Sequence, residues 1–178
     1  MNDSRRLVPV RPRSQRDGEG CIELLRAVYA ADEYPTIWPK HPGRWLTPSR
    51  FLAAWVALNG STVVAHIALV GIAEPADECL VAASGRPASQ MAEIARLFIH
   101  PDSRGGGLAE RLLDTASSYA KGRGLLPVIE VNERRARAIR VYERTGWRRV
   151  GTGPADWVNP SGERPLLHYF LRPDEKQF

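Results

Sequence analysis

Residues 97–116, LFIHPDSRGGGLAERLLDTA, run from an apolar stretch through a proline and three consecutive glycines into a helical pattern. A strand, a glycine-rich turn and a helix together favour phosphate binding, because unpaired backbone N–H groups at a helix N-terminus converge on an anion. The glycines let the main chain approach such a ligand closely. On the local pattern alone, a turn shaped by three glycines for geometry only is an equally good interpretation.

Two familiar nucleotide-binding motifs do not fit this turn. A dinucleotide-binding fold requires G-x-G-x-x-G, but the sixth position counted from Gly105 is Glu110. A P-loop requires a lysine followed by serine or threonine, and the glycines are followed by neither. The turn therefore predicts an anion site of another kind.

The segments before the hairpin predict an edge strand and two helices. Residues 7–13, LVPVRPR, indicate a strand at a sheet edge, because their prolines cannot donate ladder hydrogen bonds. Residues 17–32 carry an apolar stripe at helical spacing, with Asp17 as the expected N-cap. Residues 47–55 begin with Thr-Pro, which is typical of a helix start, so a short second helix is expected there.

The rest of the chain predicts alternating strands and helices. Residues 55–71 contain Asn59-Gly60 between two β-branched runs, which is the signal of a tight hairpin. Residues 74–90 are expected to form a connector with a helical turn in DECLVAAS. The apolar patterns that follow predict a strand at 92–100, a helix at 108–124, a strand at 125–132, a helix at 134–146, and strands at 147–158 and 165–171.

The glycine turn resembles the acetyl-CoA signature of the GNAT N-acetyltransferase superfamily. That signature reads Arg or Gln, two residues, Gly, one residue, then Gly or Ala, and here Arg104, Gly107 and Ala109 match it. Downstream, VIEV and AIRVYERTGW resemble the second conserved block of the family, and the expected upstream elements follow the family order. The similarity covers residues 7–172, with its specific motifs between 93 and 147.

The resemblance implies an α/β (α+β) class GNAT fold, with a mixed, mostly antiparallel, twisted sheet of about six to seven strands and about four flanking helices. It also implies that the strands at 93–99 and 126–131 splay into a V-shaped slot for the thioester. Within the strand at 93–99, alternation places Glu93 and Leu97 on the same side unless a bulge intervenes. One N-acetyltransferase domain is expected over residues 1–178, because this length and 43% hydrophobic residues suit one core.

The family match implies where acetyl-CoA binds. Backbone amides of the turn are expected to hold the pyrophosphate and the preceding strand the pantetheine arm, which gives as cofactor-binding candidates Leu97, Phe98, Ile99, Arg104, Gly105, Gly106, Gly107, Leu108, Ala109, Asn132 and Arg135. Many family members carry an asparagine seven residues before the tyrosine of the second block, where this chain has Arg135 and where Asn132 lies three residues too early. Arg135 is expected either to reach a phosphate or to be solvated, and solvation is favoured.

Acetyl transfer from a thioester to an amine needs a neutral amine, a stabilised oxyanion and a protonated leaving thiolate. Tyr142 matches the tyrosine that faces the sulfur in the family and is the candidate general acid, although its helical spacing also fits simple packing. Glu130 and Glu93 are the candidate bases, with Glu130 ranked first, and a carboxylate paired with an arginine is the alternative for each. Cys21 and Cys79 lie far from the motifs, so a ping-pong route is not expected.

The resemblance places the acceptor between the loop after the first helix and the final hairpin. Asp32, Glu33, Tyr34, Trp38 and Asp156 in these segments are the candidate substrate-binding residues, because carboxylates and aromatic faces bind an ammonium group. The alternative is that the aromatic residues anchor a lid over the core.

The expected function is an acetyl-CoA-dependent N-acetyltransferase (EC 2.3.1-type) that acetylates the primary amine of a small molecule by direct attack in a ternary complex. A peptide or protein N-acetyltransferase and a non-catalytic acyl-CoA-binding module are the alternatives. The net charge of +5 fits an anionic partner, but the arginine run after position 133 fits a solvated helix face, so nucleic acid is not expected. No metal-ligand spacing and no membrane-length apolar run occur, which favours a cytoplasmic monomer or homodimer without metal.

Overall fold

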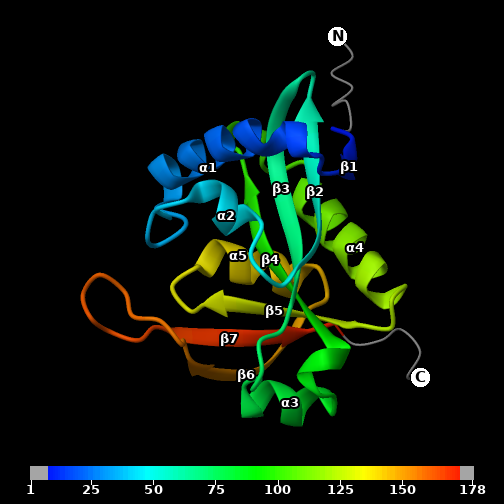
Figure 1. The fold of residues 1–178 in the computed structure, drawn as a ribbon, viewed down its shortest axis with the longest axis vertical. Helices are drawn as coiled ribbons and strands as arrows, with labels where there is room; N and C mark the ends of the chain where they lie inside the picture. Colours follow the sequence, from blue (N-terminus) through cyan, green and yellow to red (C-terminus); the bar gives the residue numbers. More distant parts are fainter. Residues whose placement is uncertain (1–7, 173–178) are drawn as a thin grey trace.

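The computed structural model describes residues 8–172 and contains a seven-stranded sheet with the order β1-β2-β3-β4-β5-β7-β6 (Figure 1). Neighbouring strands are antiparallel except β4 and β5, which are parallel. This confirms the mixed, mostly antiparallel sheet expected from the sequence. The strands are β1 (Val10–Pro12), β2 (Phe51–Asn59), β3 (Thr62–Gly71), β4 (Met91–Ile99), β5 (Leu126–Asn132), β6 (Arg148–Pro154) and β7 (Leu166–Leu171).

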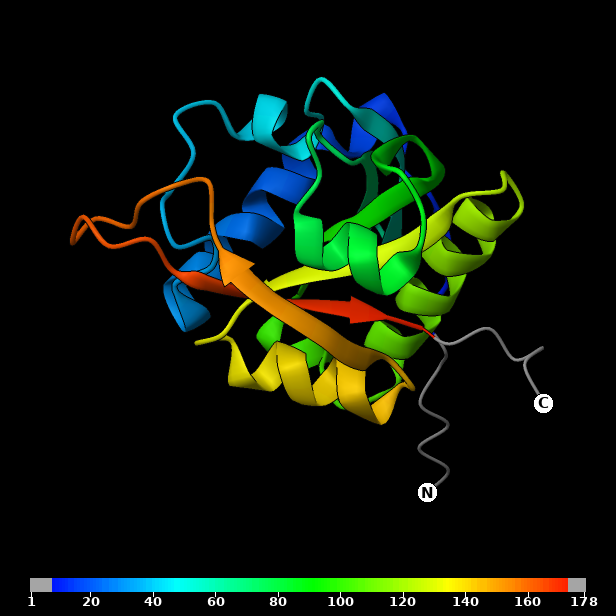
Figure 2. The same ribbon diagram turned by 90° about the horizontal axis from the view of Figure 1, so that it is seen from below.

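Helices cover both faces of the sheet, as Figure 2 shows. One face carries α1 (Gly18–Asp32), α2 (Pro42–Leu46) and α3 (Glu78–Ser84), and the other carries α4 (Leu108–Lys121) and α5 (Ala136–Arg144). The apolar residues of α4 recur every three or four positions, so one side of the helix is buried, with Leu112 and Leu113 fully inaccessible. Each such leucine contributes about 1.5–3 kcal/mol by leaving water, which fixes α4 against the centre of the sheet. Within residues 8–172, no helix is long and apolar enough to cross a membrane.

Strands β4 and β5 pair only at their beginnings. Residues 91–93 of β4 face residues 126–128 of β5, and no pairing between the two strands continues beyond Glu93 and Val128. From there β5 pairs with β7 instead, and the two halves of the sheet run apart at a steep angle (Figure 1). The V-shaped splay expected between the central strands is therefore confirmed.

A bulge interrupts β4 on its other edge. The pairing with β3 shifts between His66 and Ala68, and Arg96 has a φ of 53°, which is rare for a residue other than glycine. The extra residue reverses the alternation, so Leu97 packs with the apolar cluster under α4, whereas Glu93 lies on the opposite face. A bulge is the exception to simple alternation, and because one is present Glu93 and Leu97 do not share a side.

The helix predicted at residues 47–55 is also wrong, because residues 51–59 form β2 and the short α2 comes earlier, at residues 42–46. Strand β2 pairs with both β1 and β3, and this pairing buries Val56 completely. The sheet thus overrides the local helix-start signal. The side chain of Thr47 accepts a hydrogen bond from Arg13 instead of capping a helix.

Asp17 precedes α1 as predicted, but its carboxylate does not cap the helix. The carboxylate accepts hydrogen bonds from the guanidinium of Arg11 at 2.7 and 2.8 Å and from the backbone of Ser14 at 2.7 Å. The Arg11 bond is the main reason why the pKa of Asp17 lies far below its usual range. The predicted edge strand is confirmed at Val10–Pro12, while Leu7 lies outside the described residues.

Close packing at Gly151 holds α3 on β6. A Cβ atom there would lie 1.9 Å from Sγ of Cys79, so we expect Gly151→Ala to lower the free energy of unfolding by about 1–3 kcal/mol through overpacking. Denaturant titration measures the loss. The double variant Gly151→Ala/Cys79→Ala should recover most of it, because the next contact, with Cβ of Cys79, is at 3.4 Å. Strictly additive losses in the double variant would show that this contact is not the cause.

Candidate active site

The glycine turn between β4 and α4 leaves its backbone open. Gly105 and Gly107 have φ values of 83° and 72°, which L-residues rarely adopt, and a Cβ on any glycine of residues 105–107 would meet no atom within 4 Å. Helix α4 begins at Leu108, so the N–H groups of its first turn have no partner in the helix. These donors lie at the positive end of the α4 dipole and can bind an anion without rearrangement.

Arg104 belongs to the turn, but its side chain binds the end of α1. Its guanidinium forms an ion pair with the carboxylate of Asp32, and its Nε donates to the carbonyl oxygen of Ile99 at 3.1 Å. The ion pair neutralises Asp32 and ties α1 to the glycine turn. Asp32 is therefore held beside the turn, and its carboxylate is engaged before any acceptor amine arrives.

Arg135 clamps the loop after α1 instead of pointing into solvent. It donates to the carbonyl oxygens of Asp32 and Glu33 at 2.8 and 2.7 Å and to the hydroxyl of Thr36 at 3.0 Å, and it lies over the ring of Tyr34. Helix α1 ends here with unpaired carbonyl groups, which attract a cation. The favoured expectation of a solvated Arg135 is thus wrong.

The side-chain oxygen of Asn132 is also used within the protein. Its Oδ1 accepts a hydrogen bond from the backbone N–H of Arg134 at 2.9 Å and closes the turn between β5 and α5. The side chain of Glu33 is exposed, and its residue has a φ of 53° at the end of α1.

Glu93 and Glu130 occupy the two diverging strands. Burial raises the pKa of both carboxyl groups above the usual range, and the charges of Glu93 and Asp156 raise the pKa of Glu130 further. The positive charges of Arg96 and Arg50 act on Glu93 in the opposite direction. The structure thus brings together two carboxyl groups, the candidate bases, that hold protons more tightly than ordinary glutamates.

Tyr142 lies on the other face of the sheet, on α5. Its side chain is 8% exposed and packs at 5.8 Å from the ring of Phe170. Among residues 8–172, its hydroxyl has no hydrogen-bond partner. Burial raises the pKa of this phenol well above the usual range, and the charges of Tyr34 and Glu93 act in the same direction. Because Glu93 acts on the hydroxyl electrostatically, groups from the two faces approach each other where the strands part.

Backbone groups of β4 face this opening. The N–H of His100 donates to the carbonyl oxygen of Val64 in β3 at 2.8 Å. In an antiparallel ladder, backbone groups alternate between the two sides of a strand, so Phe98 also faces β3, whereas Leu97 and Ile99 direct theirs towards β5. Because β5 has already diverged, the amides of Leu97 and Ile99 remain open to a ligand. The backbone of Phe98, also a predicted cofactor contact, is used by the sheet.

The predicted acceptor residues fall into two groups. Tyr34 and Asp156 lie within electrostatic reach of Glu93. Asp32 is bound to Arg104, and Trp38 packs edge-on against an aromatic ring of α1 at a centroid distance of 5.3 Å. Tyr34 and Asp156 are therefore the two predicted acceptor residues that interact electrostatically with Glu93.

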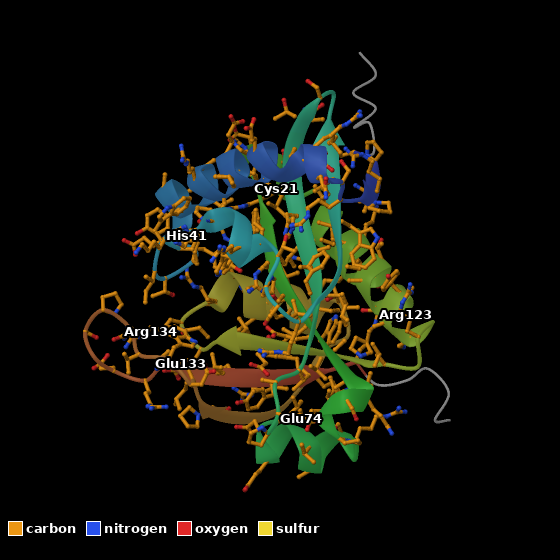
Figure 3. The ribbon with its side chains drawn as sticks, in the orientation of Figure 1. Cys21, His41, Glu74, Arg123, Glu133 and Arg134 are labelled. Atoms are coloured by element: carbon orange, nitrogen blue, oxygen red, sulfur yellow. The ribbon has the colours of Figure 1, made fainter. Side chains whose placement is uncertain are left out.

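A cavity of about 500 Å³ lies between that loop and the β6–β7 loop. Its lining includes Thr36 and Glu33 from the first loop, Asn159 from the second, and Arg134 at the end of β5. Figure 3 shows Arg134 beside the β6–β7 loop, where it lies 3.7 Å from Glu163 and is 72% exposed. The cavity is thus flanked by the two segments that the resemblance assigned to the acceptor. In the part of the chain that the structure describes, no group of three or more His, Cys, Asp or Glu is placed to hold a metal ion.

One polar network escaped sequence analysis. His66 of β3 is fully buried, with Nδ1 at 2.9 Å from the carbonyl oxygen of Arg96 and Nε2 at 3.0 Å from Arg13. The only signal in the sequence was the presence of His66 and Arg96 within largely apolar strands. The contact between these two residues lies at the bulge, whose position no local pattern predicts.

Comparison with known proteins places these features in a family. The model of the acetyltransferase (GNAT) family matches residues 21–147. A search of curated proteins found no match. Similar solved structures include Arabidopsis thaliana NAA60 in complex with acetyl-CoA (16% identity, TM-score 0.71, covering 93% of this chain and 97% of that chain). A ribosomal-protein-alanine N-acetyltransferase from Brucella melitensis is also similar (19% identity, TM-score 0.66, covering 93% of this chain and 99% of that chain).

A third similar structure is provisionally assigned as a phosphinothricin N-acetyltransferase (22% identity, TM-score 0.66, covering 93% of this chain and 98% of that chain). At such identities the structural likeness shows the fold, whereas the family model spans more than half of the 178 residues. Together with the open glycine turn and the diverging strands, this match shows that the chain belongs to the GNAT family of acetyltransferases, which use acetyl-CoA as the acetyl donor.

Proposed function

We propose that this GNAT acetyltransferase transfers the acetyl group to the primary amine of a small molecule by direct attack in a ternary complex. The observation that carries the proposal is the meeting of two carboxyl groups from one face of the sheet with an unpartnered phenol from the other, at the point where β4 and β5 part. Direct transfer is assisted by a base at the attacking amine and an acid at the leaving sulfur.

The donor side is formed by backbone groups. Acetyl-CoA supplies an acetyl group activated as a thioester. The open amides of residues 105–109 would hold its diphosphate, and the outward-facing backbone of Leu97 and Ile99 would hold the pantetheine arm. The fit is supported by the exposed glycines, which leave the approach to the amides free of side chains.

The proposed step moves two protons and exchanges one bond. The amine nitrogen bonds to the carbonyl carbon, the carbon–sulfur bond breaks, a glutamate takes the amine proton, and Tyr142 gives its proton to the thiolate. The raised pKa keeps Tyr142 protonated, and a thiolate formed in the same buried slot is itself a stronger base. Burial raises the pKa of the Cys21 thiol to about 11, so it does not supply a covalent intermediate.

Glu93 is the better candidate for the base that removes the proton from the amine. Glu130 is the better candidate for a neighbouring carboxyl group that does not contact the amine. The charge of Glu93 acts on the hydroxyl of Tyr142, and Glu93 lies at the last paired position of β4 and β5. The negative charges of Glu93, Asp156 and Asp77 all raise the pKa of Glu130. Once Glu93 is ionised, Glu130 therefore ionises less readily.

The acceptor side favours a cationic amine. Asp156 and both glutamates place negative charge on this face, and Tyr34 adds an aromatic surface. A separate cavity of about 500 Å³, whose lining includes none of these four residues, is in the size range of small-molecule sites. A peptide amine is the second candidate, because the cavity lies between two surface loops that a longer chain can follow out of the protein.

Thiol release tests the proposal. With acetyl-CoA and a panel of small amines and short peptides, free CoA should form only when an amine is present, and Tyr142→Phe should lower kcat by about 100-fold or more because the acid is lost. Tyr119→Phe, a tyrosine on α4 that packs against Trp55, is the control and should keep full activity. Unchanged turnover of Tyr142→Phe removes Tyr142 from the mechanism. Binding of acetyl-CoA without release for any amine would indicate an acyl-CoA-binding module.

The pH profile identifies the base. Because burial raises the carboxyl pKa values, kcat/KM should rise with pH through a limb near neutrality rather than near the ordinary carboxyl value of about 4. Glu93→Gln should abolish the limb and most of the activity. Glu130→Gln should leave the limb nearly in place, because the pKa of Glu130 is about 8 and that of Glu93 about 7, so Glu130 is still uncharged where Glu93 ionises. The reverse pattern would make Glu130 the base, and a limb unchanged in both variants would exclude both residues.

Substitution of two aspartates should affect the KM values of the two substrates separately. Asp156→Asn is expected to raise the KM of the amine by about three- to tenfold and leave the KM of acetyl-CoA unchanged, because it weakens attraction for a cation. Asp32→Asn should raise the KM of acetyl-CoA and leave the KM of the amine unchanged, because it frees Arg104 and loosens the glycine turn. Steady-state kinetics with one substrate saturating measures each value. Equal effects of the two variants on both KM values would contradict this division.

A further inference from the structure

We infer that His66 is a positioning residue for acetyl transfer. It holds the peptide between Arg96 and Leu97 so that the Leu97 N–H points into the opening between β4 and β5, where it can donate to the thioester oxygen. The inference rests on the proposed function and adds to it the side chain that orients this backbone donor.

The partners of His66 define which ring nitrogen carries the proton. Nε2 lies 3.0 Å from a guanidinium nitrogen of Arg13, and because a guanidinium only donates, Nε2 must accept. The neutral ring therefore carries its hydrogen on Nδ1, which donates to the carbonyl oxygen of Arg96 at 2.9 Å. Burial lowers the pKa of His66 to about 3, so the ring stays neutral.

The geometry of the peptide then sets the direction of the next N–H. The bond between Arg96 and Leu97 is trans, so its C=O and N–H point in opposite directions. The C=O points to the ring of His66, so the N–H points away from that ring. The alternation counted from the His100–Val64 bond directs this N–H away from β3.

The sheet itself offers no partner for this N–H. Leu97 is skipped in the pairing with β3, and the pairing with β5 ends at Glu93. The bulge also takes the carbonyl of Arg96 out of the ladder, so His66 replaces a bond that the sheet would otherwise make. The result is a free amide held in one orientation.

The surroundings of His66 fix its ring. Phe98 stacks on it at a centroid distance of 4.9 Å and an angle of 19°. Arg13 is itself anchored by the carbonyl oxygen of Leu46 at 3.1 Å and the hydroxyl of Thr47 at 2.6 Å. The donor to Arg96 is thus rigid, as a preorganised site requires.

A donor aimed at the thioester oxygen would lower the reaction barrier. Negative charge grows on that oxygen when the amine attacks, and a donor that is already oriented stabilises it without reorganisation. The bond from His66 to the carbonyl also polarises the same peptide and strengthens its N–H as a donor. Loss of the His66 bond should therefore lower kcat more than it weakens acetyl-CoA binding.

Two amide substitutions distinguish orientation from packing. His66→Asn keeps an N–H at the position of Nδ1, whereas His66→Gln places its amide at the position of Nε2, and His66→Phe keeps only the ring. We expect kcat to fall about tenfold or more for Gln and Phe but less than about threefold for Asn, with the KM of acetyl-CoA little changed in all three. Equal losses in Asn and Gln, or no loss in Gln and Phe, would overturn the inference.

A measurement without an acceptor gives a second readout. The carbonyl ¹³C resonance of [1-¹³C]acetyl-CoA should move downfield when the wild-type protein binds it, return towards the free position in His66→Gln and His66→Phe, and stay shifted in His66→Asn. Equal shifts in all proteins would overturn the role of His66. Absence of acetyl-CoA binding by the wild type would instead refute the proposed function.

Arg13→Met keeps the test valid if the His66 variants do not fold. This variant leaves the ring in place but removes the contact that fixes its tautomer. We expect a smaller downfield shift and a kcat lowered by about threefold or more. An unchanged shift together with an unchanged kcat would overturn the inference.

Discussion

The end of pairing between β4 and β5 is the constraint on which the site depends. The two strands share three paired positions and then part, because β5 continues against β7 while β4 stays on β3. Beyond this point the edges of two strands, normally satisfied by each other, carry open backbone groups inside the protein. A ligand that supplies amides and carbonyls of its own, as a pantetheine arm does, can restore that bonding.

The divergence also lets the two faces of the sheet act on one point. In a continuous sheet, side chains on opposite faces are separated by the backbone layer. Here Tyr142, carried by α5 on one face, lies within electrostatic reach of Glu93 on the other. An acid and a base from the two faces can therefore approach one reacting carbon, and burial of each raises its pKa.

Arginines connect the segments around this opening. Arg104 ties the glycine turn to α1, Arg135 holds the loop after α1, and Arg96 lies over the ring of Trp45 in α2. Each guanidinium neutralises a carboxylate, satisfies carbonyl groups or covers an aromatic face, so the charges of these three arginines are used within the fold. Arg135 is therefore not solvated, although it belongs to an arginine-rich segment.

The sequence alone determined the order of most strands and helices and the glycine turn, because periodicity and turn chemistry are local properties. The candidate roles of Tyr142, Glu93 and Glu130 came from the resemblance to the family. The local sequence pattern misplaced the second helix, since pairing with two neighbouring strands overrides a helix-start signal. Only the tertiary structure decided the bulge at Arg96, the burial of His66 and the partners of Arg135. These depend on contacts between segments 30 to 103 residues apart, and the physical rule involved, that buried polar groups must find partners, acts only once the chain is folded.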